Sequence, residues 1–95
     1  MTILPEDRIA ERLMQVPGWS RDHDHIVRKF EFEDFLRALS FVNRVGEIAE
    51  GMNHHPDIHL ENYRWVTLRV TTHDSGGLTE RDFALAQKID ALPLS

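Results

Sequence analysis

The first thirty residues change from a helical spacing of hydrophobic positions to an alternating one. Ile9, Leu13 and Val16 would share one face of a short helix, with Pro5 in its first turn. The Pro17–Gly18 pair is expected to end this helix. Residues 19–32, WSRDHDHIVRKFEF, then alternate in the way that is typical of a β-hairpin, with the DHD stretch as its turn.

A second helical pattern begins at Glu33 and predicts a long central helix of about five turns. Pro56 disfavours helical geometry at His55, so this helix is expected to end near Asn53. His54 and His55 would therefore lie where the chain leaves the helix and enters a strand. The apolar stripe of the helix is predicted to comprise Phe35, Leu39, Val42, Ala49 and Met52, flanked by Leu36, Val45 and Ile48.

Alternation returns at Ile58 and predicts a second hairpin. ENYR at residues 61–64 would form its turn, and WVTLRVTTH at residues 65–73 would form its second strand. His73 would then lie at the tip of that strand, before the SGG stretch that breaks it.

A last helix is predicted to follow, with Thr79 as its N-cap, Asp82 three residues on, and Leu78 placed to contact Phe83. The resulting order, α-ββ-α-ββ-α, predicts a two-layer α+β fold in which the apolar face of a four-stranded antiparallel sheet packs under the helices. We expect residues 1–95 to form a single domain.

The composition narrows the class of protein. The net charge is −5 and no block of Lys or Arg occurs, which argues against a nucleic-acid groove or a membrane-surface patch. The absence of cysteine excludes disulfides, thiolate catalysis and cysteine-based zinc sites. The N-terminus lacks a signal-peptide pattern and no apolar run reaches the roughly 20 residues that span a bilayer, so we expect a cytoplasmic location. A domain of this size has a thin core, so we also expect self-association.

Imidazole is concentrated in the middle of the chain, between Glu50 and Asp74. His54 and His55 precede a proline that bends the chain, and the three imidazoles of His54, His55 and His73 would converge on one cleft. Imidazole titrates near neutral pH, so such a cluster would suit general acid–base catalysis. The remaining histidines are expected to be solvated at turns and outer strand faces: His23, His25 and His59.

Metal binding is the main alternative for these histidines. His55 and His59 are four residues apart, but Pro56 removes the helical face that would bring them together, and no HExxH motif occurs. Local chemistry therefore favours proton transfer over metal binding. A nucleophilic triad is less favoured still, since no serine lies in a nucleophile-elbow motif.

The chain resembles the pterin-4a-carbinolamine dehydratase family in a series of spaced motifs. Glu50 is followed after three residues by His54-His55-Pro56, then by Tyr63, and TTHD at residues 71–74 leads into GLTERD at residues 77–82. The resemblance extends to GWS at residues 18–20 and FEFEDFLRALSFVNRV at residues 30–45, and so covers almost the whole chain. The predicted order of elements also agrees with the fold of that family.

The resemblance implies an activity and a set of site residues. Members of the family dehydrate 4a-hydroxytetrahydropterins, including 4a-hydroxytetrahydrobiopterin, to quinonoid dihydropterin and water, which implies a hydro-lyase in tetrahydrobiopterin recycling that uses no cofactor and no metal. His54 and His73 would be the acid–base groups, and His55 would mainly hold the pterin. The implied substrate-binding residues are Glu50, Asn53, His54, His55, Thr71, Thr72, His73 and Asp74, and the implied supporting residues are Pro56, Arg81 and Asp82.

The resemblance also implies partners and leaves one alternative function. It implies a homodimer or homotetramer, and an aromatic amino-acid hydroxylase acting in the same pathway. The alternative is a non-enzymatic dimerisation or interaction module of the same fold, and the complete set of histidines favours the enzyme. Two residues depart from the usual family pattern, since Gly51 stands where many members carry lysine and Asn53 where many carry aspartate.

Overall fold

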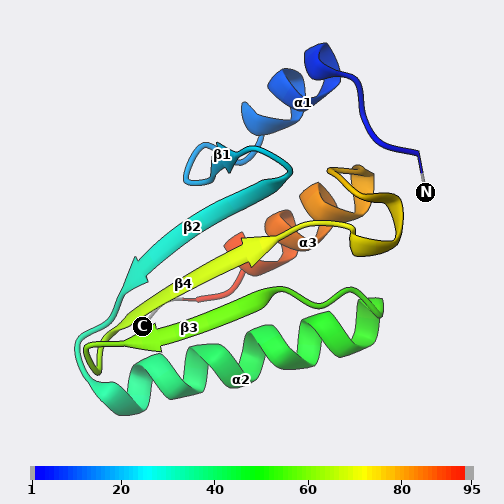
Figure 1. Ribbon diagram of the computed structural model, residues 1–95. Coiled ribbons are helices and arrows are strands. Elements are labelled where there is room, and N and C mark those ends of the chain that lie inside the picture. Colours follow the sequence, from blue (N-terminus) through cyan, green and yellow to red (C-terminus); the bar gives the residue numbers. More distant parts are fainter. Residues whose placement is uncertain (1, 94–95) are drawn as a thin grey trace.

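The computed structural model describes residues 2–93 and has the predicted α-ββ-α-ββ-α order (Figure 1). A four-stranded antiparallel sheet packs against helices, which confirms the α+β class. One short 3₁₀ helix, η1, was not predicted. The elements are α1 (Glu6–Leu13), β1 (Ser20–Asp22), β2 (His25–Glu31), α2 (Phe35–Met52), β3 (Asp57–Glu61), β4 (Trp65–Val70), η1 (His73–Ser75) and α3 (Glu80–Asp90).

The sheet has the strand order β1-β2-β4-β3, so the two strands of the second hairpin lie at one side of the first. Ile26 lies opposite Val70 and Ile58 lies opposite Leu68, so the apolar positions of these strands fall on one face. Side chains of α2 and α3 belong to the same buried cluster as this face, and both helices lie on that side of the sheet (Figure 1). The opposite face carries alternating polar residues such as Lys29.

Helix α2 ends next to Asn53 as the sequence predicts, but it begins at Phe35 rather than at Glu33, and its buried face differs from the predicted stripe. Asp34 caps its start by accepting a hydrogen bond from the backbone N–H of Arg37 at 2.8 Å. The side chains that face the sheet are Ala38, Phe41, Val45 and Ala49, whereas Phe35, Leu36 and Leu39 are exposed. Two apolar rows lie side by side on this helix, and helical spacing alone does not say which row meets the sheet. The aromatic ring of Phe41 decides it, because its centroid lies 4.7 Å from that of Phe30 on β2.

Helix α1 is shorter than predicted. Pro5 is its N-cap rather than a residue of its first turn, and the helix ends at Leu13, before the Pro17–Gly18 pair. Val16 lies beyond the helix and is nevertheless buried in the core, because the turn after Leu13 directs it inward. The apolar spacing therefore predicted the buried face but not the length of the helix.

A pair of arginines joins α1 to the first turn of α3. Arg8 Nη2 and Arg12 Nη2 donate hydrogen bonds of 3.0 Å and 2.8 Å to Oε2 of Glu80. These hydrogen bonds, that from Arg12 first, hold the pKa of Glu80 below its ordinary value. The start of α3, which carries residues of the site described below, is thus held from the N-terminal side of the chain.

Helix α3 has the predicted N-terminal signals. Thr79 and Asp82 form a capping box, and Leu78 and Phe83 are both buried in the core. Within residues 2–93, no helix has the length and hydrophobicity required to span a membrane.

Candidate active site

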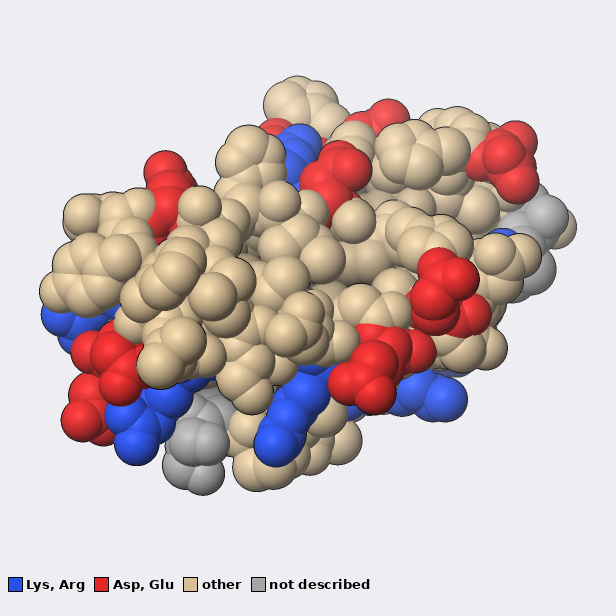
Figure 2. All heavy atoms as spheres, turned by 90° about the horizontal axis from the view of Figure 1, so that it is seen from below, with Lys and Arg blue, Asp and Glu red and all other residues tan. Residues whose placement is uncertain are grey.

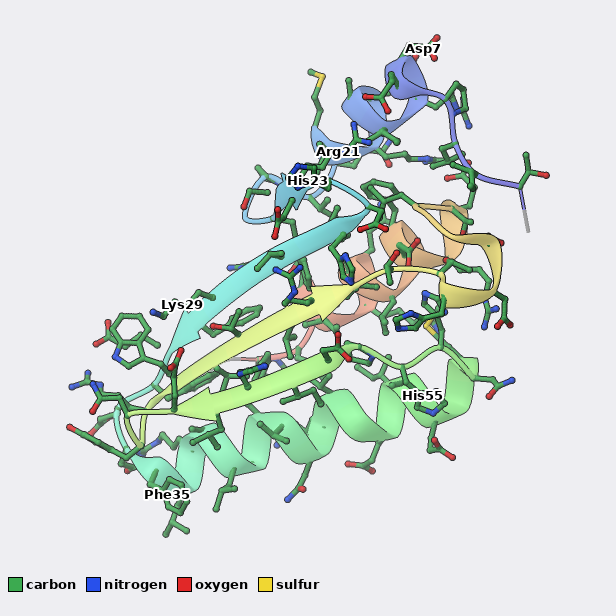
Figure 3. The ribbon with its side chains drawn as sticks, in the orientation of Figure 1. Asp7, Arg21, His23, Lys29, Phe35 and His55 are labelled. Atoms are coloured by element: carbon green, nitrogen blue, oxygen red, sulfur yellow. The ribbon has the colours of Figure 1, made fainter. Side chains whose placement is uncertain are left out.

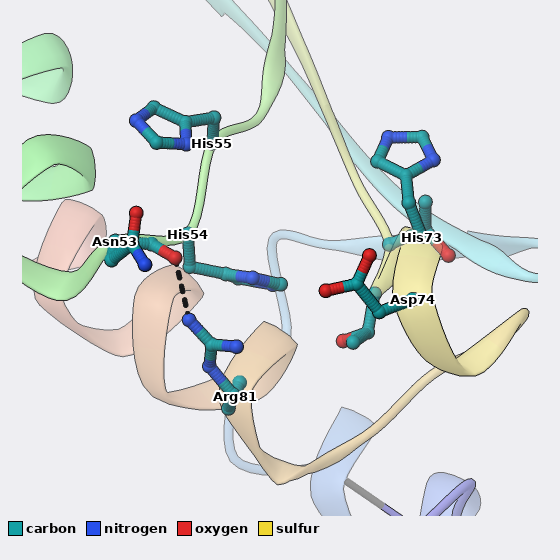
Figure 4. A pocket seen from close by; sticks show the side chains of 8 residues that line it. Asn53, His54, His55, His73, Asp74 and Arg81 are labelled. Carbon is teal, nitrogen blue, oxygen red and sulfur yellow. Dashed lines mark hydrogen bonds between the residues drawn. The ribbon is translucent and has the colours of Figure 1, made fainter.

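A cavity of about 260 Å³ lies where α2 ends and β4 leaves the sheet. Figure 3 shows His55 at this end of α2 and Phe35 at the other end. All predicted substrate-binding residues except Glu50 line the cavity, together with Arg81 from α3 (Figure 4). The lining residues are Asn53, His54, His55, Thr71, Thr72, His73, Asp74 and Arg81.

The end of α2 places the two adjacent histidines on different sides of the chain. Asn53 closes the helix in the left-handed conformation, with φ 51° and ψ 44°, which asparagine accepts more readily than most residues. Pro56 then leads into β3, so only a few residues connect the two elements. Within them His54 turns inward, with 6% of its surface exposed, and His55 is exposed.

The buried carboxylate of Asp82, which does not line the cavity, holds the ring of His54. His54 Nε2 lies 2.6 Å from Oδ1 of Asp82, which is completely buried. Oδ2 of Asp82 accepts two further hydrogen bonds at 2.8 Å, from the Thr72 hydroxyl and the Thr79 backbone N–H. The Thr72 and Thr79 hydroxyls also lie 2.8 Å apart. Asp82, predicted from sequence as a capping residue and supporting position, therefore also joins α3 to the catalytic candidate and to the segment after β4.

This arrangement sets the chemical role of each nitrogen of His54. An ionised carboxylate offers only acceptors, so His54 Nε2 must carry the hydrogen of the contact with Asp82. In the neutral ring Nδ1 is then the acceptor, and in the protonated ring it is the donor. The ring can therefore take up or release a proton at Nδ1 while its bond to Asp82 is kept.

His55 has a different environment. Its Nε2 lies 2.5 Å from Oε2 of Glu50, which belongs to the last turn of α2, and the two side chains are 57% and 78% exposed. Glu50 is thus in contact with a lining residue without lining the cavity itself. The pair can orient the His55 ring toward a bound molecule, although its exposure makes the interaction weak.

His73 lies in a turn and not at a strand tip, so this part of the strand prediction was wrong. Strand β4 ends at Val70, Thr72 and Gly77 form an isolated bridge, and His73 begins η1. Gly76, with φ 74°, takes the left-handed conformation that closes this turn. The exposed side chain of His73 enters the cavity from the side opposite the His54–His55 segment (Figure 4).

The remaining histidines lie outside the cavity. His23 is 94% exposed in the β1–β2 turn, and His59 is exposed on the polar face of β3. The prediction that His25 is solvated was wrong, because its side chain is only 19% exposed and its Nδ1 lies 2.8 Å from Oδ1 of Asp24. Among residues 2–93, no three His, Asp or Glu side chains are arranged to hold a metal ion.

Comparisons with known proteins point to one family. The family model described as pterin 4 alpha carbinolamine dehydratase matches residues 2–92. A protein of Thermomicrobium roseum named "Putative pterin-4-alpha-carbinolamine dehydratase" is 49% identical over 92 residues, which cover 97% of this chain and 98% of that protein. A protein of the same name from Halorhodospira halophila is 51% identical and covers 95% of this chain and 85% of its own length.

Solved structures agree with these relatives. A transcriptional coactivator/pterin dehydratase from Brucella melitensis has a TM-score of 0.89 and 33% identity, and the match covers 95% of this chain and 97% of that one. A pterin dehydratase-like protein described as a RuBisCO assembly factor of the alpha-carboxysome has a TM-score of 0.61 at 19% identity, with 77% of this chain and 83% of that one covered. The second likeness shows a shared fold only.

Proposed function

The chain belongs to the pterin-4a-carbinolamine dehydratase family, and on that premise we propose that it converts a 4a-hydroxytetrahydropterin to quinonoid dihydropterin and water. The observation that carries the proposal is the presence of two imidazoles, His54 and His73, on opposite sides of one polar cavity (Figure 4). A buried carboxylate orients the first of them. Together they supply an acid and a base to one bound molecule.

The reaction needs both groups at once. An acid protonates the 4a-hydroxyl group so that it leaves as water, and a base removes the proton from N5 as the N5=C4a double bond forms. His54 acts through Nδ1, the nitrogen that its bond to Asp82 leaves free. His73 acts from the other side of the cavity, and proton exchange with water restores the starting state of the pair. No redox step occurs, so the residues present suffice without a cofactor.

The test is turnover of a 4a-hydroxytetrahydropterin by the purified protein, compared with the spontaneous dehydration. We expect acceleration that is unaffected by EDTA, because proton transfer by imidazole requires no metal. Loss of activity on chelation, restored by a single divalent ion, would favour the metal-binding interpretation. No acceleration at any pH between about 6 and 8, where imidazole titrates, would contradict the proposal.

His55 is proposed to hold the pterin and not to move a proton. Its ring is exposed at the cavity and oriented by Glu50. We expect His55→Ala to raise KM several-fold while kcat stays within about threefold, because an interaction made equally with substrate and transition state affects binding alone. Steady-state kinetics check this, and a kcat as low as that of a His54 variant would assign His55 a catalytic role.

The proposed role in the cell is tetrahydrobiopterin recycling, with an aromatic amino-acid hydroxylase as the source of the substrate. This pairing follows from the chemistry of the substrate, which is what a pterin-dependent hydroxylase leaves behind. A protein that carries out only this step depends on such a hydroxylase.

Self-association is proposed to occur through the N-terminal half of α2. Phe35, Leu36 and Leu39 are 46%, 75% and 37% exposed there, and uncharged surface dominates this side of the molecule (Figure 2). A thin core and an exposed apolar patch together favour contact with a second copy of the chain. The same patch would serve the alternative function, in which the protein is a non-enzymatic interaction module.

We therefore expect Leu36→Glu to convert an oligomer to a monomer at micromolar concentration, as measured by light scattering. Met14→Glu is the matched control, because Met14 is 82% exposed at the end of α1 and away from the patch. A wild-type protein that is already monomeric would contradict the proposal, as would equal dissociation by both variants.

A further inference from the structure

Two consecutive residues of α3 bind the segment that carries His54. Arg81 Nη2 donates a hydrogen bond of 2.6 Å to the carbonyl oxygen of Asn53 (Figure 4). Oδ1 of Asp82 lies 2.6 Å from Nε2 of the His54 ring. The same Arg81 nitrogen lies 3.2 Å from the carbonyl oxygen of Met52. Arg81 thus holds this segment through its backbone carbonyl groups, and Asp82 holds it through the imidazole of His54.

The backbone contact satisfies a specific need of α2. The last carbonyl groups of a helix lack partners within the helix, and they form the negative end of its dipole. The guanidinium of Arg81 supplies donors and a positive charge at this end. The backbone N–H of Asn53 already donates to the carbonyl oxygens of Ala49 and Glu50. The carbonyl group of Asn53 has no such partner in the helix, so it depends on a donor from elsewhere in the fold.

The carbonyl group of Asn53 belongs to the peptide unit that ends at the nitrogen of His54. Peptide units are planar, so fixing this oxygen fixes the direction in which the chain enters His54. The bond of the ring to Asp82 fixes the other end of the residue. Without the first contact, rotation of the peptide would move the imidazole relative to the cavity while Asp82 still held Nε2.

We propose that Arg81 is a positioning residue for the dehydration, which holds the Asn53–His54 peptide so that His54 Nδ1 stays directed at the reacting atoms. This inference rests on the proposed function. Because Arg81 also lines the cavity, the competing interpretation is direct contact with the pterin. The two differ in kinetics, since misplacing a catalytic group lowers kcat, whereas losing a uniform binding contact raises KM.

The experiment compares Arg81→Met and Arg81→Lys with Arg64→Met. Arg64 is a matched control because its Nε donates to a backbone carbonyl group, that of Phe32, at 3.0 Å, and it lies outside the cavity lining. We expect Arg81→Met to lower kcat by about 10- to 100-fold with KM within about threefold. Arg81→Lys should recover part of this loss, and Arg64→Met should stay close to wild type.

Amide hydrogen exchange supplies a readout that does not depend on turnover. The N–H groups of Asn53 and His54 both bond to the carbonyl oxygen of Ala49. We expect Arg81→Met to speed their exchange by on the order of tenfold or more, and Arg64→Met to leave it unchanged. Unchanged exchange in Arg81→Met would overturn the inference, and so would faster exchange with an unchanged kcat or a raised KM alone. A wild-type protein without turnover would refute the proposed function, whereas the exchange measurement would still decide whether Arg81 holds this peptide.

Discussion

Replacing either His54 or His73 by alanine is expected to lower kcat by about 10²–10⁴, the usual contribution of a general acid or base. The two residues enter the cavity from different elements, His54 after α2 and His73 in η1. Neither can take over the other's proton transfer, because dehydration removes a hydroxyl group and a proton from different atoms of the pterin. Steady-state kinetics with a 4a-hydroxytetrahydropterin measure the effect.

His59→Ala is the control for these variants. His59 is an exposed histidine of β3 and does not line the cavity, so its replacement should leave kcat within about twofold. Circular dichroism confirms that each variant is folded, which we expect for His73→Ala because His73 is exposed. If His59→Ala lost as much activity as His73→Ala in a folded protein, the assignment of the site would be wrong.

The pH dependence of the single variants separates the two roles further. A residue that acts as the base must be neutral and one that acts as the acid must be protonated, so the wild-type profile of kcat/KM should be bell-shaped. Each alanine variant should lose one limb of the bell. The limb that disappears in His54→Ala then identifies His54 as acid or as base.

The sequence was sufficient to predict two of the elements that position the site, the end of α2 and the start of α3. The stop of α2 near Asn53 followed from Pro56, and the start of α3 followed from Thr79 and Asp82, since both depend on local backbone chemistry. The cluster of His54, His55 and His73 was visible because a proline and a turn place these residues at the ends of elements.

Properties that depend on tertiary contacts were beyond the sequence alone. Spacing could not show which apolar row of α2 faces the sheet, because the answer depends on the fit of Phe41 against the aromatic residues of β2. It also could not show that His73 leaves the strand, since the alternation of β4 continues past Val70 and the turn depends on the bridge between Thr72 and Gly77.

The sequence shows the helix-capping role of Asp82 but not its contact with His54. A carboxylate three residues after Thr79 is explained locally as half of a capping box, and the family resemblance implied a supporting role for Asp82 without identifying His54 as its partner. Only the packing of α3 against the end of α2 brings His54 to its second oxygen. The same packing gives Arg81 its contact with Asn53. The first turn of α3 therefore supports the site in ways that only the assembled fold reveals.

Asp82→Asn is expected to lower kcat by about 10²–10³ in a protein that still folds, because it reverses the hydrogen bond to His54. Oδ2 of Asp82 accepts from the Thr79 N–H and the Thr72 hydroxyl, so an asparagine must keep its carbonyl oxygen there. Its NH₂ group then faces His54 Nε2 and donates to it. The neutral ring would carry its hydrogen on Nδ1, so it could not accept a proton there as a base. To act as an acid the ring would also need a hydrogen on Nε2, and that hydrogen would meet the NH₂ group of the asparagine.

Asp34→Asn is the matched control for this substitution. Asp34 is also a carboxylate at a helix start that accepts a backbone N–H, but it lies at the far end of α2 and touches no histidine. Because asparagine caps a helix about as well as aspartate, this variant should keep its activity. The ¹⁵N chemical shifts of the His54 ring report the tautomer directly. They should show the hydrogen on Nδ1 instead of Nε2 in Asp82→Asn, and on Nε2 in the wild type and in Asp34→Asn. A folded Asp82→Asn protein with wild-type kcat would show that the carboxylate serves only to cap α3, and an unchanged tautomer would show that it does not direct His54.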